Sequence, residues 1–149
     1  MKKIILLAVL LNVFTFTFVS AQTRKIPAEV TEAFKAKFPD AKNVEWKDNI
    51  SDFHVDFTLN DASWSAEFSS KGEWKESNKK MTFDSLPAAV KEGYNKSKYS
   101  DWSPGTVTMI EKSDNSILYK IYTEKSSIVQ KRFLYFNKDG QLEKDAPGI

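Results

Sequence analysis

The sequence predicts an α+β protein in which helices pack on one face of a curved antiparallel sheet. Two stretches place apolar residues at helical spacing, and each is followed by segments in which apolar and polar residues alternate. Both kinds of stretch recur in the same order along the chain, as expected for an internal repeat. An antiparallel sheet with helices on one face buries both patterns, so we expect a tandem repeat of one helix and about four strands.

The first 21 residues have the three parts of a signal peptide. Two lysines precede the apolar stretch Ile4–Phe14, and the small residues Val19-Ser20-Ala21 provide a cleavage site. A membrane-spanning helix needs about 20 apolar residues, and this stretch is shorter. We expect cleavage after Ala21, which leaves residues 22–149 as a periplasmic or secreted protein without stable membrane insertion.

Composition restricts the partners and the chemistry. The chain has 22 basic and 20 acidic residues, and loss of the two leader lysines makes these numbers equal. A neutral chain lacks the positive surface that nucleic acid requires, so nucleic acid is not an expected partner. Cysteine is absent, which excludes thiol nucleophiles, disulfides and lipid attachment at a cysteine.

Two pairs of similar segments define the predicted repeat. Ile26–Phe34 lines up with Leu86–Tyr94, sixty positions later, and Phe68–Trp74 lines up with Phe136–Leu142, sixty-eight positions later. The larger second offset requires an insertion, which we expect around Ser97–Gly105. The two predicted repeats cover residues 26–77 and 86–145 of the mature domain, with bounds approximate by a few residues.

Each repeat is expected to begin with a helix that has one apolar stripe. The stripes consist of Val30, Phe34 and Phe38 in the first copy and of Leu86, Val90 and Tyr94 in the second. Pro39 should end the first helix, since proline cannot continue the hydrogen-bond ladder. Ser85 should cap the second helix by accepting a hydrogen bond from a free backbone N–H.

After each helix the apolar spacing changes to two, which is typical of strands. Asn60-Asp61 is expected to form a two-residue hairpin turn, because both residues tolerate a positive φ. The expected strands lie around residues 44–46, 53–59, 64–68 and 74 in the first copy and 107–110, 117–123, 128–136 and 141–143 in the second. The residues expected to be buried between helices and sheet are Phe34, Phe38, Trp46, Phe57, Trp64, Phe68 and Val90.

The pattern Ile-Pro-Ala-Glu-Val-(x3)-Phe-(x3)-Phe-Pro-(x)-Ala-(x4)-Trp across residues 26–46 resembles the PepSY-like family, also described as β-lactamase-inhibitor-like. These are small exported proteins found largely in Bacteroidetes. The resemblance covers nearly all of the mature chain as a tandem pair, although Tyr99-Ser100 replaces Phe-Pro in the second copy and Trp102–Gly105 is extra. It implies a helix-over-sheet fold doubled into a long curved sheet, and it implies no reaction.

The sequence contains no recognisable catalytic, metal or cofactor site. His54 is the single histidine, and a common zinc site needs more nitrogen or sulfur ligands. A small hydrolase remains a remote alternative, in which His54 and Asp56 share a strand face and Ser63 or Ser65 supplies the nucleophile. No G-x-S-x-G motif supports it. We therefore expect a protein that is not an enzyme.

The sheet face away from the helices has different chemistry in the two copies. In the first copy it should carry polar side chains. In the second, Leu118 and Val129 should join the candidate partner-binding residues Tyr122, Phe133, Tyr135, Lys120 and Lys131. Aromatic residues on an open face are typical of interfaces.

The leading interpretation is a non-enzymatic exported binding module that engages an envelope protein or a peptide through this face. A structural or stress-related envelope protein without a defined ligand site is the alternative. The sequence leaves the oligomeric state open.

Overall fold

The computed structural model describes residues 25–49, 51–128 and 130–148. The predicted signal peptide and Val129 lie outside these ranges. The described residues form two α-helices, two short 3-10 helices and eight strands. In chain order they are α1 (Ala28–Lys37), β1 (Lys42–Asp48), β2 (Asp52–Leu59), β3 (Ala62–Ser69), β4 (Trp74–Met81), η1 (Phe83–Ser85), α2 (Ala88–Lys96), β5 (Ser103–Lys112), β6 (Ile117–Lys125), η2 (Ser126–Ile128), β7 (Gln130–Asn137) and β8 (Leu142–Pro147).

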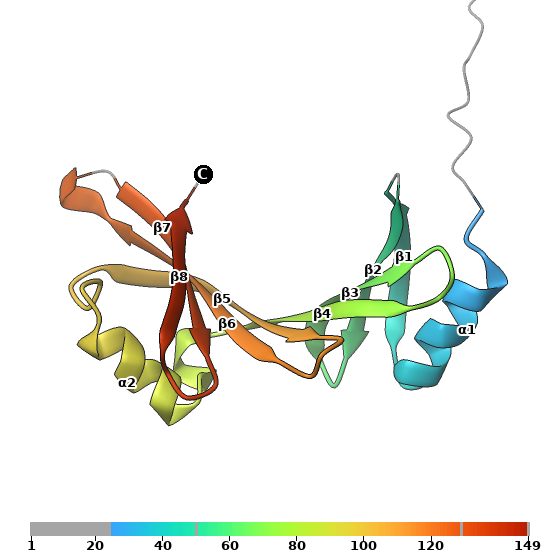
Figure 1. Cartoon of the computed structure of the whole chain (residues 1–149), viewed down its shortest axis with the longest axis horizontal. Coiled ribbons are helices and arrows are strands. Elements are labelled where there is room, and N and C mark those ends of the chain that lie inside the picture. Colours follow the sequence, from blue (N-terminus) through green and yellow to red (C-terminus); the bar gives the residue numbers. More distant parts are fainter. Residues whose placement is uncertain (1–24, 50, 129, 149) are drawn as a thin grey trace, which may run out of the picture.

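All eight strands form one antiparallel sheet in which each strand pairs with its neighbours in sequence, from β1 to β8. The sheet twists strongly along its length, with α1 near one end and α2 near the other (Figure 1). The α+β class and the curved antiparallel sheet are confirmed. The strand order needs no crossover, because each strand joins the next through a turn or through a helix that packs on the sheet.

Both helices cover the same face of the sheet. Residues directly opposite each other on paired strands point to the same face. One such row runs from Phe57 through Trp64, Lys79 and Met109 to Tyr119. Phe57 belongs to the core under α1, and Tyr119 belongs to the core under α2. Neither α1 nor α2 packs on the other face of the sheet, which is called the open face below.

The core under α1 is built around Phe34. Its ring centroid lies 5.1 Å from Phe57, 5.4 Å from Trp46 and 5.6 Å from Phe38, so one helix side chain contacts two strands and the end of its own helix. The spacing of Val30, Phe34 and Phe38 explains this contact, since residues four apart lie on one face of a helix. Five of the seven predicted core residues are buried, while two tryptophans pack partly buried at the core edge. The buried ones are Phe34, Phe38, Phe57, Phe68 and Val90, and the two at the edge are Trp46 and Trp64.

The core under α2 contains more hydrogen bonds. Tyr94 is 2% exposed, and its hydroxyl lies 2.7 Å from that of Thr123 and donates to the carbonyl of Trp102 at 3.0 Å. Burial raises the pKa of this Tyr94 hydroxyl. The predicted cap is wrong, because α2 begins at Ala88 after Pro87, and no side chain caps it. Ser85 instead ends η1, where its hydroxyl lies 2.7 Å from that of Thr82.

The second half differs from the predicted strand bounds at both ends. β5 begins at Ser103, so part of the expected insertion is strand, with a bulge between Pro104 and Val107. Across the bulge β5 advances three residues, from Pro104 to Val107, while β6 advances two, from Thr123 to Ile121, so the alternation of faces along β5 shifts by one residue. β8 extends to Pro147, well beyond the short strand expected there. The 3-10 helix η2 occupies the expected start of β7.

Three of the turns with positive φ connect β2 to β3, β3 to β4 and β7 to β8. Asn60 and Asp61 have φ of 50° and 58°, which confirms the predicted two-residue hairpin. Gly72 and Gly140 both have φ of 80°. A Cβ at Gly72 would lie 2.6 Å from the carbonyl oxygen of Glu29 in α1, and one at Gly140 would lie 2.1 Å from that of Ala89 in α2. In each half, a glycine turn therefore packs against the backbone of the first helical turn.

Candidate functional site

The β1–β4 end of the open face is polar, and the charge of Asp56 at this end is paired with neighbouring side chains. Asp56 binds Lys47 Nζ through Oδ2 at 2.6 Å and His54 Nε2 through Oδ1 at 3.0 Å. The hydrogen bond from Lys47 lowers the pKa of Asp56, and His54 acts in the same direction. A carboxylate held by two partners is well satisfied, so this end offers little to a ligand.

The arrangement around His54 does not form a hydrolytic site. Strand pairing places Ser65 opposite Asp56 and Ser63 opposite Thr58, whereas His54 lies opposite Glu67. Within the described ranges, no hydrogen bond joins His54 to a serine, and a nucleophile must contact its base.

Metal ligands are likewise not gathered in the part of the chain that the structure describes. No group of three His, Cys, Asp or Glu side chains lies close enough to hold an ion there. Asp52 at the start of β2 accepts hydrogen bonds from Lys75 at 2.5 Å and Ser51 at 2.9 Å, and these lower its pKa. Its carboxylate is thus part of an ion pair that joins β2 to β4.

The β5–β8 end of the open face carries three aromatic side chains, which we call the aromatic patch: Tyr122, Phe133 and Tyr135. Tyr122 lies opposite Phe133 across β6 and β7, with ring centroids 5.6 Å apart. Lys120 Nζ lies 4.3 Å from the centre of the Phe133 ring, which is within range of a cation–π contact. Lys131 is exposed on the same face, opposite Glu124.

The rings of the aromatic patch are half-buried, whereas the sequence predicted exposed rings. Tyr122 packs over Gly105, where a Cβ would lie 2.8 Å from its ring, and its hydroxyl donates to Glu124 at 2.9 Å. Desolvation and Glu124 both raise the pKa of Tyr122. The glycine in β5 therefore makes room for the tyrosine, and the patch forms one packed layer on the sheet.

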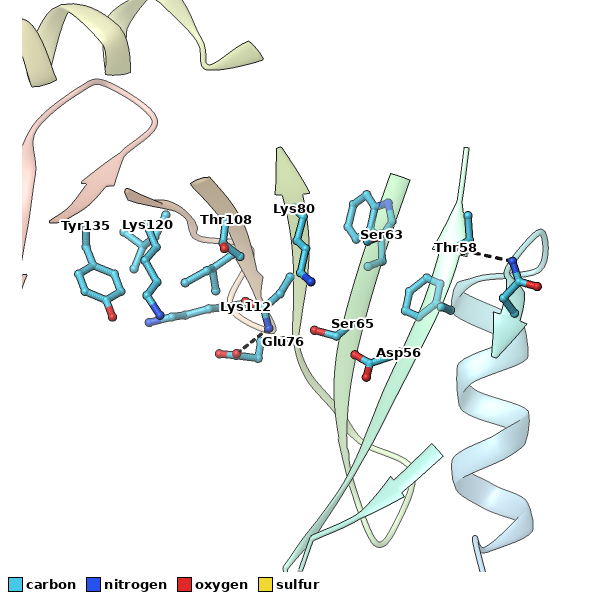
Figure 2. A pocket seen from close by; sticks show the side chains of 16 residues that line it. Asp56, Thr58, Ser63, Ser65, Glu76, Lys80, Thr108, Lys112, Lys120 and Tyr135 are labelled. Atoms are coloured by element: carbon cyan, nitrogen blue, oxygen red, sulfur yellow. Dashed lines mark hydrogen bonds between the residues drawn. The ribbon is translucent and has the colours of Figure 1, made fainter. Parts of the chain in front are cut away.

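A hollow of about 830 Å³ lies on the open face between the polar end and the aromatic patch. Figure 2 shows side chains from β2 to β7 arranged around it. Its charged lining residues and its tyrosine are Asp56, Glu76, Lys80, Lys112, Lys120 and Tyr135. Phe57 and Trp64 also border it, although their side chains belong to the core under α1. The hollow follows from the strong twist of the sheet, which makes this face concave.

Sequence reasoning identified Lys120 and Tyr135 but missed the contributions of β4 and β5. Lys80 and Lys112 line the hollow, and Lys144 of β8 places its Nζ 5.4 Å from the centre of the Tyr135 ring. The alternation of polar residues along β4 was the available signal. It places Lys80 on the same face as Glu76 and Asn78 once β4 is known to extend beyond Trp74.

A second cluster of charges lies on the face that the helices cover. Asp145 of β8 accepts hydrogen bonds from Tyr99 and Arg132, and Lys98 Nζ lies 3.3 Å away. The hydrogen bond from Tyr99, together with those from Arg132 and Lys98, lowers the pKa of Asp145 to about 2. This cluster joins the edge strand β8 to β7 and to the segment after α2, which is a structural role.

Comparison with known proteins gives one family and several similar folds. Residues 51–144, more than half of the chain, match the family described as beta-lactamase-inhibitor-like and PepSY-like. The chain matches none of the curated proteins with which it was compared. Within the described residues, the two helices are too short and too polar to cross a membrane.

Three solved structures of Bacteroides proteins have similar folds. A DUF2874 family protein from Bacteroides ovatus has a TM-score of 0.78 and 22% identity, over 83% of this chain and 88% of that one. A BLIP-like protein from Bacteroides fragilis has a TM-score of 0.77 and 20% identity, over 83% and 86%. A candidate periplasmic protein from Bacteroides eggerthii has a TM-score of 0.76 and 23% identity, over 83% and 89%. At these identities the likeness establishes the fold alone.

Proposed function

Because the chain belongs to the PepSY-like, beta-lactamase-inhibitor-like family, we propose that it is an exported binding module without enzymatic activity. It engages a protein or a peptide through the β5–β8 end of its open face. The observation that carries this proposal is the aromatic patch, which stands beside the hollow on a face that no helix covers. Export is supported by the leader-like N-terminus and by the candidate periplasmic relative.

The aromatic patch has the composition and energy of an interface centre. Aromatic residues are enriched at such centres. Burial of the exposed part of one half-buried ring removes roughly 50 Å² of apolar surface from water, which stabilises a complex by about 1 kcal/mol at about 25 cal/mol per Å². Three half-buried rings are also pre-ordered by their contacts, so binding costs little side-chain entropy.

The two halves are, in this proposal, copies of one unit whose open faces have diverged. Two features support it. The glycine turns contact equivalent helix positions, Gly72 against Glu29 and Gly140 against Ala89. Register shifts also occur at equivalent places, after Glu67 in the β3–β4 pair and after Tyr135 in the β7–β8 pair. With the same scaffold at both ends, the difference in side chains on the open face determines which end binds.

The test is a double variant, Phe133→Ser with Tyr135→Ser, in the mature protein. Binding to a partner captured from envelope extract should weaken about tenfold or more, since 1.4 kcal/mol is a factor of ten. Each cross-strand pair on a sheet face contributes roughly 0.2–1 kcal/mol, so the variant should still fold and melt cooperatively.

The matched control is Ser65→Ala with Glu67→Gln, at the corresponding positions of β3. It should leave both binding and melting temperature unchanged. If the patch variant folds and every envelope partner still binds, the proposal is wrong and a structural envelope protein without a ligand site takes its place.

A further inference from the structure

One row of the open face carries a lysine on every second strand. Each residue of this row lies opposite the next one on the neighbouring strand. From β4 to β8 the row consists of Lys80, Thr108, Lys120, Tyr135 and Lys144. We call these five residues the lysine row. Figure 2 shows Lys80, Thr108, Lys120 and Tyr135 beside the hollow.

The lysine row has no carboxylate partner within the described part of the chain. The nearby acids have other partners, since Asp56 binds Lys47 and His54, and Glu76 accepts a hydrogen bond from Asn78 at 3.0 Å. Two lysines of the row lie over aromatic rings, Lys120 over Phe133 and Lys144 over Tyr135. These contacts hold the ammonium groups on the open face without neutralising them.

We propose that the lysine row binds an acidic polypeptide segment in the polyproline II conformation, which lies across the strands. This inference rests on the proposed function and names the partner's chemistry. Neighbouring strands are about 4.8 Å apart, so lysines on alternate strands are about 10 Å apart. A polyproline II chain has three residues per turn and rises about 3.1 Å per residue. Carboxylates at every third position therefore lie on one side of the segment, about 9 Å apart, and match the row.

The adjacent row favours a polypeptide over a simple polyanion. Ile110 and Leu118 lie opposite each other on β5 and β6, and both line the hollow. Each is two residues along its strand from Thr108 or Lys120, so they lie on the same face. They provide an apolar strip beside the charged row, which suits the prolines or aliphatic side chains of a peptide. Thr108 and Tyr135 add hydroxyl groups that can donate hydrogen bonds to the backbone carbonyls of the bound segment. These carbonyls are available because a polyproline II chain makes no internal hydrogen bonds.

The experiment uses a synthetic peptide of repeated Glu-Pro-Pro triplets and the isosteric Gln-Pro-Pro peptide, titrated into the mature protein by calorimetry at low salt. The Glu peptide should bind and the Gln peptide should bind at least tenfold more weakly. The triple variant Lys80→Gln, Lys120→Gln, Lys144→Gln should weaken the Glu peptide about tenfold or more. This variant loses three ion pairs to the peptide, and a factor of ten in affinity corresponds to about 1.4 kcal/mol.

The matched control is the triple variant Lys35→Gln, Lys71→Gln, Lys138→Gln, which changes net charge equally at exposed positions on α1 and two turns. It should retain binding of the Glu peptide. Equal loss in both triple variants, or equal binding of the Glu and Gln peptides, would overturn the acidic-segment proposal. Salt at about 1 M, where the Debye length is about 3 Å, should abolish the difference between the peptides.

Failure of this inference is distinguishable from failure of the proposed function. If the Glu-Pro-Pro peptide does not bind while an envelope partner is lost from the Phe133→Ser, Tyr135→Ser variant, the open face binds a partner of different chemistry. If the open-face variants weaken binding of neither the Glu-Pro-Pro peptide nor an envelope partner, both proposals are wrong. Melting curves of every variant exclude loss of fold as the cause.

Discussion

The two ends of the open face share a strand register and differ in their side chains. Ser65 and Glu67 on β3 stand where Phe133 and Tyr135 stand on β7, three residues and one residue before the phenylalanine that anchors each core. Asp56 at the polar end is paired with Lys47 and His54. The lysine row, which begins on β4 and crosses the aromatic end, has no carboxylate partner among the described residues. The comparison indicates that the sheet is a common scaffold and that binding depends on substitutions at a few outward positions.

The helix-covered face also differs between the two halves, and on this face the second half has the more polar interactions. The core under α1 consists of aromatic and aliphatic side chains around Phe34. The core under α2 includes the buried Tyr94–Thr123 hydrogen bond and, at its margin, the ion pair of Asp145 with Arg132. Stability of the first half should therefore depend on packing, and that of the second should depend in part on ionisation.

The largest expected effect comes from removing the central ring of the first core. Phe34→Ala should destabilise the protein by roughly 3–5 kcal/mol, because a buried phenylalanine loses its transfer energy and leaves a cavity. This is comparable to the whole stability of a small domain. Denaturant unfolding measures it. An unchanged midpoint would mean that α1 does not pack through Phe34, and the exposed control Lys35→Ala should have little effect.

The next effect tests whether the two glycine turns are equivalent. Gly72→Ala and Gly140→Ala should each destabilise by about 1–3 kcal/mol, because both have positive φ and a new Cβ would overlap a helix carbonyl. Gly140→Ala should be the more damaging, since its Cβ would lie 2.1 Å from Ala89 O against 2.6 Å for Gly72 and Glu29 O. In thermal melts, destabilisation by one variant and none by the other would contradict the equivalence of the two contacts.

Much of the fold followed from periodicity, because an alternation of two determines which residues face the core. Phe68 and Phe136 are both fully buried, and counting outward from them gives the faces of β3 and β7. The start of β5 was missed because Pro104 and Gly105 are typical of loops, yet here they belong to a bulged strand that makes room for Tyr122. Ser85 was misplaced because helical spacing alone does not fix the first residue of α2.

The candidate site was less predictable than the fold. The hollow depends on the twist of eight strands, and no local pattern in the sequence specifies how far a sheet twists. Lys80 and Lys144 join the row only through the pairing of β4 with β5 and of β7 with β8. Together with the pairing of β5, β6 and β7, they bring Lys80 and Lys144, which are 64 positions apart in the sequence, into one row.

A smaller effect tests the role of ionisation in the second half. The pKa of Asp145 is about 2 in the folded protein and about 3.9 in an unfolded chain. A lowered folded pKa contributes stability that is present above pH 4 and is lost as the pH falls toward 2. The melting temperature of the wild type should therefore fall more steeply across this window than that of Asp145→Asn. Parallel curves would show that the cluster does not link ionisation to folding.

The smallest effect is expected at the polar end, and it sharpens the contrast with the aromatic patch. His54→Ala removes one of two partners of Asp56, but Lys47 still binds that carboxylate at 2.6 Å. Exposed ion pairs contribute about 0–1 kcal/mol, and the His54 side chain is 29% exposed. We expect the melting temperature to change by a few degrees at most and binding through the open face to stay within twofold.

The measurement pairs thermal melts with the peptide titration. A loss of binding comparable to that of the Phe133→Ser, Tyr135→Ser variant would extend the site to the β1–β4 end. The two ends would then act together, contrary to the division of roles inferred from their side chains.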